Sequence, residues 1–280
     1  MKNTKETNII FWGTPELCIP YLNTLKEAGY TIQAIVTTPD KPVGRKQILT
    51  PSATKVWGIA HNIKILQPEK LDALFEQELK TLSPDISIVV AYGRIIPQST
   101  IDIPSHGTLN VHYSLLPRWR GASPVEAAIL AGDNSTGVSI QKMKYELDAG
   151  DVIAEESITL KGGEFSEDLK QSLTEKGSAL LANILPNYLE GLVQAKPQNP
   201  SDISKCGIIS KSDGEINLGE SPTLLWRKYR AYKPWPGIFF FDETGKRIKI
   251  TQARFDQGEF IIEKIIPEGK KETDWKHYKQ

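Results

Sequence analysis

The 280-residue sequence has little cysteine or histidine, and its 34 Lys and Arg balance its 34 Asp and Glu. Two Cys cannot form a disulfide framework, and with four His they leave no spaced cluster for a structural zinc. No apolar run approaches the roughly 20 residues of a membrane-spanning helix. The opening residues, MKNTKETN, lack the apolar stretch of a signal peptide. We therefore expect a cytoplasmic protein with no metal site and no membrane segment.

The apolar content is sufficient for a packed core, since 39% of the residues are hydrophobic. A chain of this length suits one large domain and one small domain. Periodicity stops at Lys196–Ser201, where two prolines stand among polar residues. We expect a catalytic domain at 1–195, a linker at 196–204 and a small, mostly β domain at 205–280.

Short apolar runs alternate with amphipathic segments through the first two thirds of the chain. Strands are expected at 9–12, 32–36, 86–90, 109–112, 137–143 and 152–159, and helices at 68–82, at 123–131 and from Ser166, interrupted at Pro186. Another helix is expected after Thr14 as N-cap, with Pro20 marking either a kink or its start. This alternation is typical of βαβ units and predicts an α/β fold with a Rossmann-like, doubly wound, mostly parallel sheet. In the tail we expect a helix at 222–232 and strands at 238–241, 247–253 and 259–264.

The turn after the first expected strand, Gly13-Thr14-Pro15-Glu16, lies where an open parallel sheet binds its ligand. It lacks the glycine spacing of a dinucleotide fingerprint and the lysine of a phosphate loop. A glutamate at this position would also repel a phosphate. The sequence therefore argues against NAD and ATP as ligands.

Asn110 and His112 stand two residues apart in an expected strand, so their side chains point to the same side. An amide N–H and a protonated imidazole can both donate to an oxygen that gains negative charge during acyl transfer. Asp148 is the first candidate for a carboxylate that orients the imidazole, and Asp151 is the alternative. No Ser or Cys occupies a nucleophile elbow, which favours direct transfer over a covalent acyl-enzyme.

Three stretches of sequence around these residues resemble the 10-formyltetrahydrofolate-dependent formyltransferases: Asn110–Pro124, Thr136–Val138 and Leu147–Asp151. Within that superfamily the chain is most similar to the methionyl-tRNA formyltransferases. Phe11–Glu16 is similar to their opening turn, Ala91–Gly93 to their folate-side loop, and Pro234–Gly237 to their OB-like C-terminal domain.

The resemblance implies roles for matching positions. Asn110 and His112 would polarise the formyl group and stabilise the tetrahedral intermediate, and Asp148 would keep the imidazole oriented. The acceptor amine would attack the formyl group of the co-substrate 10-formyltetrahydrofolate directly. The implied folate-binding residues are Ala91, Tyr92, Gly93, Arg94, Ile95, Ile96, Ser114, Leu115, Leu116, Pro117, Tyr145 and Leu147. Ser114 and the loop Pro117–Gly121 would also shape the acceptor side.

Two regions favour an initiator methionyl-tRNA as the acceptor and partner of a monomeric enzyme. The long connection Thr38–Thr54 resembles the family's insertion toward the acceptor stem, and Arg45 matches its functional arginine. From Lys205 onward, 15 Lys and Arg face 11 Asp and Glu, and tRNA phosphates would meet Arg227, Arg230, Lys246, Arg247 and Lys249. The implied acceptor-side residues are Gly13, Thr14, Pro15, Arg45, Lys46, Arg118, Arg120, Arg247 and Lys249.

The tail departs from the family in one respect. The family normally carries more strand and loop after the position of Arg254, so we expect this tail to be about one hairpin short of the roughly five strands of an OB-fold. An amino-sugar nucleotide N-formyltransferase is therefore the main alternative. A 10-formyltetrahydrofolate hydrolase comes next. A non-catalytic binding protein comes last, because it would be expected to lose one of Asn110, His112 and Asp148.

Overall fold

The computed structural model describes residues 6–44 and 46–278. The chain divides into two compact units, each assembled from segments that are distant in the sequence. The first unit contains residues 1–120, 137–157 and 171–204, and the second contains residues 121–136, 158–170 and 205–280. The second unit therefore takes in two segments that precede residue 196.

A sheet of seven strands, counted over the described residues, has the order β10-β9-β7-β6-β1-β2-β5. Its members are β1 (Asn8–Gly13), β2 (Thr31–Val36), β5 (Lys64–Leu66), β6 (Ile86–Val90), β7 (Thr108–His112), β9 (Ser135–Lys142) and β10 (Asp151–Thr159). The pairs β1–β2, β1–β6, β2–β5 and β6–β7 are parallel, and β7–β9 is antiparallel. The prediction of a Rossmann-like, mostly parallel sheet is confirmed.

The central strands β1 and β6 are mainly apolar because helices cover parallel sheets on both faces. All five residues of β6 are buried, as are five of the six residues of β1. Trp12 anchors the core on one face, with its ring edge-to-face against Phe75 at 5.9 Å and Tyr92 at 5.2 Å between centroids. This packing gives the carboxyl ends of β1, β6 and β7 a rigid base.

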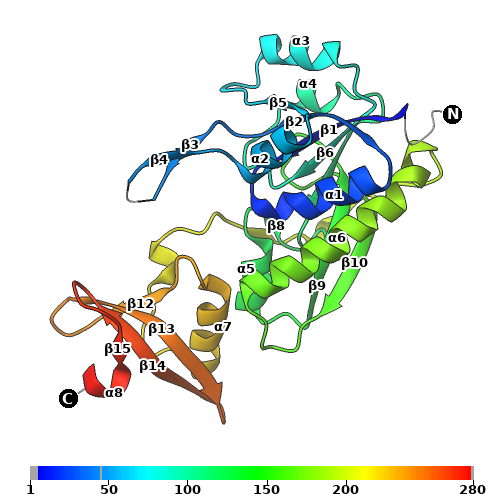
Figure 1. Ribbon diagram of the computed structural model, residues 1–280. Helices are drawn as coiled ribbons and strands as arrows, with labels where there is room; N and C mark the ends of the chain where they lie inside the picture. The colour runs from blue at the N-terminus through cyan, green and yellow to red at the C-terminus, as the bar shows by residue number, and fades with distance from the viewer. Residues whose placement is uncertain (1–5, 45, 279–280) are drawn as a thin grey trace. The chain divides into compact units, whose positions relative to one another are not determined.

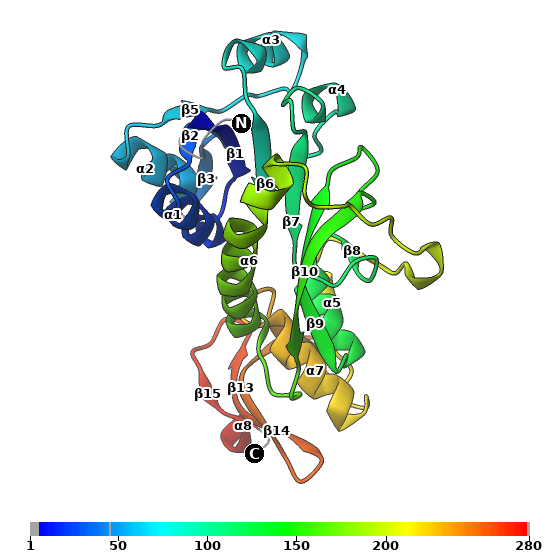
Figure 2. The same ribbon diagram turned by 90° about the vertical axis from the view of Figure 1, so that its right-hand side faces the viewer.

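The helices of the first unit are η2 (Glu16–Cys18), α1 (Ile19–Glu27), α2 (Ala53–Ala60), α3 (Ala73–Thr81), α4 (Gln98–Ile101), the 171–189 part of α6 (Ser166–Leu189), and η3 (Pro200–Asp202). The side chains of Ser52 and Asp72 cap α2 and α3 by accepting backbone N–H groups of the first turn. In both views α6 runs alongside β9 and β10 (Figures 1 and 2), and Lys176 of α6 pairs with Glu156 of β10 at 2.8 Å.

Three helix predictions need correction. Thr14 is not an N-cap, because a 3₁₀ turn follows Pro15 and α1 begins only at Ile19. Pro20 lies in the first turn of α1, where backbone N–H groups have no partner within the helix, so the missing N–H of proline costs no hydrogen bond. The helix expected from residue 68 begins at Ala73, after its cap Asp72. Pro186 does not interrupt α6, which continues through it for three residues to Leu189 at the cost of one backbone hydrogen bond.

The connection Thr38–Thr54, expected without regular structure, contains an antiparallel hairpin of β3 (Lys41–Val43) and β4 (Ile48–Thr50) and the start of α2. Figure 1 shows this hairpin extending away from α2. Its side chains are exposed, including the apolar Val43, Ile48 and Leu49 at 56%, 61% and 64%. Arg45, the insertion's predicted functional residue, lies outside the described residues.

The second unit contains α5 (Pro124–Ala131), α7 (Pro222–Tyr232) and the sheet β12 (Ile238–Phe241), β13 (Arg247–Asp256), β14 (Glu259–Pro267) and β15 (Thr273–Asp274). Its short elements are β11 (Lys205–Cys206), which pairs with β8 (Arg120–Gly121), η4 (Ser212–Gly214) and α8 (Trp275–Tyr278). Trp226 and Tyr229 of α7 stack on each other, and Trp226 also stacks on Phe255 of β13. The predicted small antiparallel β domain is confirmed, and within residues 205–278 its sheet has four strands, one fewer than an OB-fold.

Over residues 6–44 and 46–278, none of the helices combines the length and the apolar character needed to cross a bilayer.

Candidate active site

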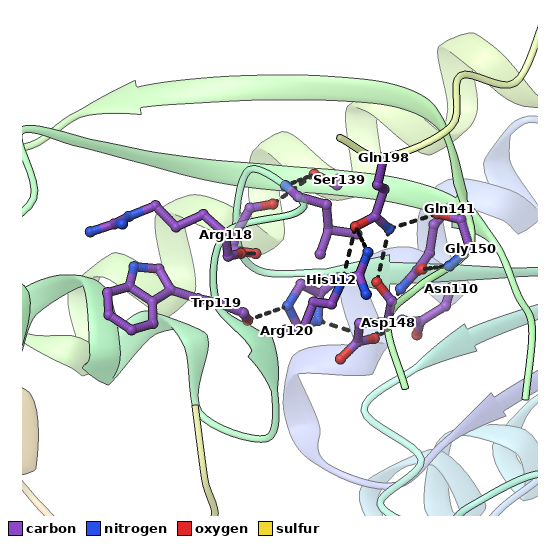
Figure 3. A network of polar contacts seen from close by, with 12 residues as sticks. Asn110, His112, Arg118, Trp119, Arg120, Ser139, Gln141, Asp148, Gly150 and Gln198 are labelled. Carbon is purple, nitrogen blue, oxygen red and sulfur yellow. Dashed lines mark hydrogen bonds and ion pairs between the residues drawn. The ribbon is translucent and has the colours of Figure 1, made fainter. Parts of the chain in front are cut away.

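The carboxyl end of β7 holds the two residues that the strand pattern singles out. Asn110 and His112 lie on the same side of β7 by alternation, and the turn between β9 and β10 brings Asp148 to them (Figure 3). Two segments, with Asn110 and Asp148 38 residues apart in the sequence, thus meet at one point.

The contacts converge on one oxygen of Asp148. Asn110 donates from Nδ2 to Asp148 Oδ1 at 3.3 Å, and His112 Nδ1 lies 3.5 Å from the same oxygen. Gln141 donates from Nε2 to it at 2.9 Å. The side chains of His112 and Asp148 are only 7% and 8% exposed, so the carboxylate depends on these neighbours for its stabilisation.

His112 has an acceptor on each side of its ring. Nε2 lies 2.9 Å from the carbonyl oxygen of Trp119, opposite the nitrogen that faces Asp148. Trp119 has a left-handed backbone with φ of 57°, and its N–H donates to Ser204 Oγ at 2.9 Å. The ring orientation is therefore fixed at both nitrogens, and a protonated ring would donate from both.

Gln141 and Gln198 contact the Asp148 turn and were not predicted from the sequence. Gln141 lies directly opposite Asn110 in the β7–β9 pair, so its side chain belongs to the same face of the sheet. Gln198, in the segment after α6, donates to the carbonyls of Asp148 and Gly150 at 2.8 and 2.7 Å. The strand alternation of β9 could have indicated Gln141 if its pairing with β7 had been known, whereas no local signal marks Gln198.

The alternative acid, Asp151, is engaged elsewhere. Its carboxylate pairs with Lys144 at 2.8 Å. Of the two carboxylates that the sequence offered as partner for the imidazole, the structure places Asp148 beside His112.

The predicted folate-side residues occupy two exposed loops and one buried turn. After β6, Ala91 and Gly93 have left-handed backbones, and Arg94 donates to the carbonyls of Pro68 and Glu69. Ile95, Tyr145 and Leu147 are 75%, 64% and 65% exposed. Tyr92 and Ile96 are buried in the core, Ser114 and Leu116 are buried in the turn after β7, and Leu115 and Pro117 are half-buried.

The predicted acceptor-side residues of the first unit differ in what they contact. Thr14 donates to the Tyr92 carbonyl at 3.1 Å, and the Gly13 carbonyl accepts from Thr54 at 2.8 Å, while Pro15 is half-buried. Lys46 is exposed in the β3–β4 hairpin. The Arg118 guanidinium lies over the Trp119 ring at 4.5 Å.

Arg120, another predicted acceptor-side residue, is only 6% exposed, and its guanidinium contacts other side chains of this chain. Its Nε and Nη2 donate to Gln198 Oε1 at 2.9 and 2.8 Å. Its remaining amino group lies 3.8 Å from Glu146, which is an exposed residue.

In the second unit, Arg247 and Lys249 lie on β13 and are half-buried, and the Arg247 guanidinium covers the Phe239 ring at 3.8 Å. The implied contact of Arg230 with tRNA phosphates is wrong. Arg230 is 4% exposed, donates to the Glu164 carbonyl at 2.9 Å, and has its pKa lowered by burial. It lies on the inner side of α7, which the count of charges along the sequence could not reveal.

A second buried polar network begins at Tyr113, the residue after His112. The Tyr113 hydroxyl lies 3.2 Å from that of Tyr21 and 2.7 Å from Thr174 Oγ1. Burial raises the pKa of Tyr113 to about 12, so the hydroxyl stays neutral at physiological pH. This network is therefore unsuited to proton transfer.

The site can stabilise negative charge on an oxygen and holds no activated hydroxyl nucleophile. The nearby Ser114 is fully buried and donates to the Arg118 carbonyl, and Ser139 is buried and donates to the Ser114 carbonyl. Within the described residues, no group of three His, Cys, Asp or Glu side chains is arranged to hold a metal ion. The chemistry offered is hydrogen-bond donation by an amide and an imidazole.

Comparison with known proteins finds matches along most of the chain. Residues 7–185 match the family described as formyl transferase, and residues 208–270 match its C-terminal domain. The chain is 38% identical over 246 residues to a methionyl-tRNA formyltransferase of Halalkalibacterium halodurans, covering 88% of this chain and 77% of that protein.

Two solved structures share the fold. A methionyl-tRNA formyltransferase from Clostridium thermocellum has a TM-score of 0.63 at 18% identity and covers 93% of this chain and 98% of its own. An N-formyltransferase from Helicobacter canadensis, solved with folinic acid and dTDP-3-aminofucose, has a TM-score of 0.67 at 15% identity and covers 91% and 95%.

Proposed function

The chain is an enzyme that belongs to the formyl transferase family, and from that premise we propose that it transfers a formyl group from 10-formyltetrahydrofolate to the amino group of methionyl-initiator tRNA. The observation that carries the proposal is the meeting of Asn110, His112 and Asp148 at one buried point at the end of β7. The relatives named methionyl-tRNA formyltransferase support the acceptor.

In the proposed reaction, Asn110 and His112 donate hydrogen bonds to the formyl oxygen as it gains negative charge. The acceptor nitrogen bonds to the formyl carbon, the bond from that carbon to the donor's nitrogen breaks, and one proton passes from the attacking amine to the leaving nitrogen. Asp148 holds the imidazole so that its other nitrogen faces the reacting oxygen. That oxygen takes the place of the Trp119 carbonyl, which lies 2.9 Å from His112 Nε2.

Direct attack is supported by the state of the nearby hydroxyls. Ser114 and Ser139 are fully buried and donate to backbone carbonyls, so neither is activated as a nucleophile. The attacking amine must be neutral, and the rate should fall at a pH where it is protonated.

The exposed loops after β6 and β9 offer what a flat, partly apolar donor needs. Ile95, Tyr145 and Leu147 present apolar side chains to solvent, and the loop after β6 turns through left-handed backbone at Ala91 and Gly93. These residues would hold the pterin part of the folate. The folinic acid in the related Helicobacter canadensis structure supports a folate donor.

For the acceptor, we propose that the segment containing Lys41, Arg45 and Lys46 approaches the tRNA. Residues 205–280 would form a shortened OB-like domain whose Arg247 and Lys249 contact tRNA phosphates. The catalytic domain would span 1–195 and the linker 196–204. An amino-sugar nucleotide is the competing acceptor, because the C-terminal sheet has four strands in its described part and sugar N-formyltransferases share the fold.

The test supplies the purified protein with 10-formyltetrahydrofolate and either methionyl-initiator tRNA or amino-sugar nucleotides, and measures which acceptor is formylated. We expect formylmethionyl-tRNA, with a KM for tRNA that rises steeply with salt, because phosphate contacts release counterions. Formylation of the sugar nucleotide with no product on tRNA would overturn the proposal. Release of formate with either acceptor would indicate a hydrolase.

A further inference from the structure

We propose that Gln141 and Gln198 are positioning residues for this reaction, which hold the Asp148 turn from two sides and thereby orient His112. The inference rests on the proposed function, since it assigns Asp148 and His112 to formyl transfer. Figure 3 shows both glutamine side chains directed at the turn, Gln141 from β9 and Gln198 from the segment after α6.

Gln141 acts on the carboxylate. Its Oε1 accepts the N–H of Gly150 at 3.0 Å, which fixes the amide orientation and leaves Nε2 facing Asp148 Oδ1 at 2.9 Å. This bond is shorter than the contacts that Asn110 and His112 make to the same oxygen, at 3.3 and 3.5 Å. Gln141 is 1% exposed, so water does not compete for the carboxylate on that side.

Gln198 acts on the backbone. Its Oε1 accepts two bonds from the Arg120 guanidinium, and because a guanidinium can only donate, the amide nitrogen must face the turn. From there Nε2 bridges the carbonyls of Asp148 and Gly150 at 2.8 and 2.7 Å. Gln198 thus connects Arg120 to the backbone of Asp148 and Gly150.

The turn needs this support because its conformation is unfavourable on its own. Asp148 has φ of 50°, in the left-handed region that L-residues avoid. Gly150 lies so close to β9 that a Cβ there would be 1.9 Å from the Lys142 carbonyl oxygen. Two amides that satisfy the polar groups of the turn therefore select the conformation that points the carboxylate at His112.

Charged and titratable groups from several elements face this turn. They are His112 from β7, Arg120 from β8, Lys144, Glu146 and Asp148 from the turn itself, and Asp151 from β10. Arg120, Glu146, Lys144 and Asp151 are paired as described above. Glu155 of β10 instead accepts from Ser139 of β9. A new carboxyl group at position 141 would therefore interact mainly with Asp148.

The first test is Gln141→Glu, which keeps the acceptor for Gly150 but replaces the donor with oxygen. At neutral and alkaline pH two carboxylates would repel each other, whereas at low pH the introduced carboxyl group would be protonated and donate to Asp148 as the amide does. We expect the ratio of variant to unaltered kcat to fall by about tenfold or more from pH 5.5 to pH 8, with little change in KM for the formyl donor. A ratio independent of pH would overturn the role of Gln141.

The matched control is Gln171→Glu. Gln171 of α6 is exposed and donates to Glu175 at 3.2 Å, so this variant also places a carboxyl group beside a carboxylate, but away from the site. The ratio of the kcat of Gln171→Glu to that of the unaltered protein should not change across the same pH range. A matching pH dependence in the control would count against the proposal, because it would show a general effect of charge.

The second test is Gln198→Glu. This variant keeps the contact with Arg120 and removes both donors to the turn, so thermal unfolding should report a folded protein. We expect kcat to fall by about tenfold to 100-fold while KM for the formyl donor changes little. A folded Gln198→Glu protein with unchanged kcat would overturn the role of Gln198, even if Gln141→Glu failed to fold.

Failure of the proposed function would look different. In that case the unaltered protein itself would not formylate methionyl-tRNA at any pH. The positioning role would still be measurable in the ring ¹⁵N resonances of His112, identified by their loss in His112→Asn. Gln141→Glu should move these resonances and Gln171→Glu should not; unmoved resonances in Gln141→Glu would overturn the positioning role on their own.

Discussion

Two buried polar networks begin at neighbouring residues of the chain, His112 and Tyr113, and they differ in kind. The first gathers amides, an imidazole and a carboxylate around Asp148 Oδ1. The second links the hydroxyls of Tyr113, Tyr21 and Thr174. Both satisfy their polar groups within the protein, as buried groups must.

The difference lies in whether a network can hold charge. In the second network burial is the main cause that raises the pKa of both tyrosines, so all of its members stay neutral at physiological pH. In the first network Asn110, His112 and Gln141 contact a carboxylate, and the second nitrogen of the imidazole lies 2.9 Å from the Trp119 carbonyl oxygen. Burial of polar groups alone therefore does not mark a site, whereas a buried carboxylate beside an imidazole is typical of one.

The largest expected effect tests the first network. His112→Ala should remove nearly all formyl transfer, a loss of about 10³-fold or more in kcat, because it deletes the donor to the formyl oxygen. Binding of the folate, measured by calorimetry, should be largely retained. An active His112→Ala enzyme would mean that the network around Asp148 has only a structural role, as the network of Tyr113 does.

Asn110→Ala should have the next largest effect. Loss of one donor to a developing oxyanion costs about 10²–10³ in rate. Single-turnover kinetics would separate this loss from any change in folate binding. A loss confined to KM would place Asn110 in binding alone.

Gly150→Ala sharpens the comparison by disturbing the turn without removing a polar side chain. The added Cβ would lie 1.9 Å from the Lys142 carbonyl oxygen, so β9 or the turn must move. A displacement of the carboxylate by about 1 Å can cost up to 10²-fold in kcat, and overpacking costs about 1–3 kcal/mol of unfolding free energy. Rate assays and urea unfolding would measure both; Gly163→Ala, where a Cβ meets nothing within 4 Å, is the control.

Tyr113→Phe should leave the rate within about twofold and lower the free energy of unfolding by about 1–2 kcal/mol, since it removes a hydroxyl bonded to Tyr21 and Thr174. Urea unfolding at pH 7 would measure the cost. A large loss of activity in a folded Tyr113→Phe protein would break the distinction between the two networks.

The smallest effect is a pH dependence of stability. Tyr113 keeps its proton up to about pH 12 in the folded chain but loses it near pH 10 when unfolded, so unfolding releases a proton between these values. Its contribution to stability is complete below pH 10 and is lost as the pH rises, by about 2–3 kcal/mol in total. Urea unfolding from pH 9 to 11.5 should show a steeper decline in the unaltered chain than in Tyr113→Phe, and equal slopes would contradict this assignment.

Much of the fold follows from local pattern. The runs that form β1, β2 and β6 are short and mainly apolar, and β7 alternates apolar Leu109 and Val111 with the polar residues of its other face, so their positions are visible without tertiary information. The sequence left open whether Pro20 kinks the first helix or marks its start, and α1 does begin beside it, at Ile19, whereas the β3–β4 hairpin was not predicted. A proline can lie inside or at the start of a helix, and the pairing of β3 with β4 depends on register rather than on composition.

The sequence by itself determined which side chains could do acyl-transfer chemistry, because the donors Asn110 and His112 are two residues apart on one strand and alternation puts them on one face. Only the tertiary structure decided that Asp148 rather than Asp151 stands beside them, that Gln141 and Gln198 hold its turn, and that Arg230 faces inward. The physical reason is that alternation acts over a few residues of one strand. The contacts of Asp148 instead depend on how β7 and β9 align and on where the segment after α6 returns to the sheet.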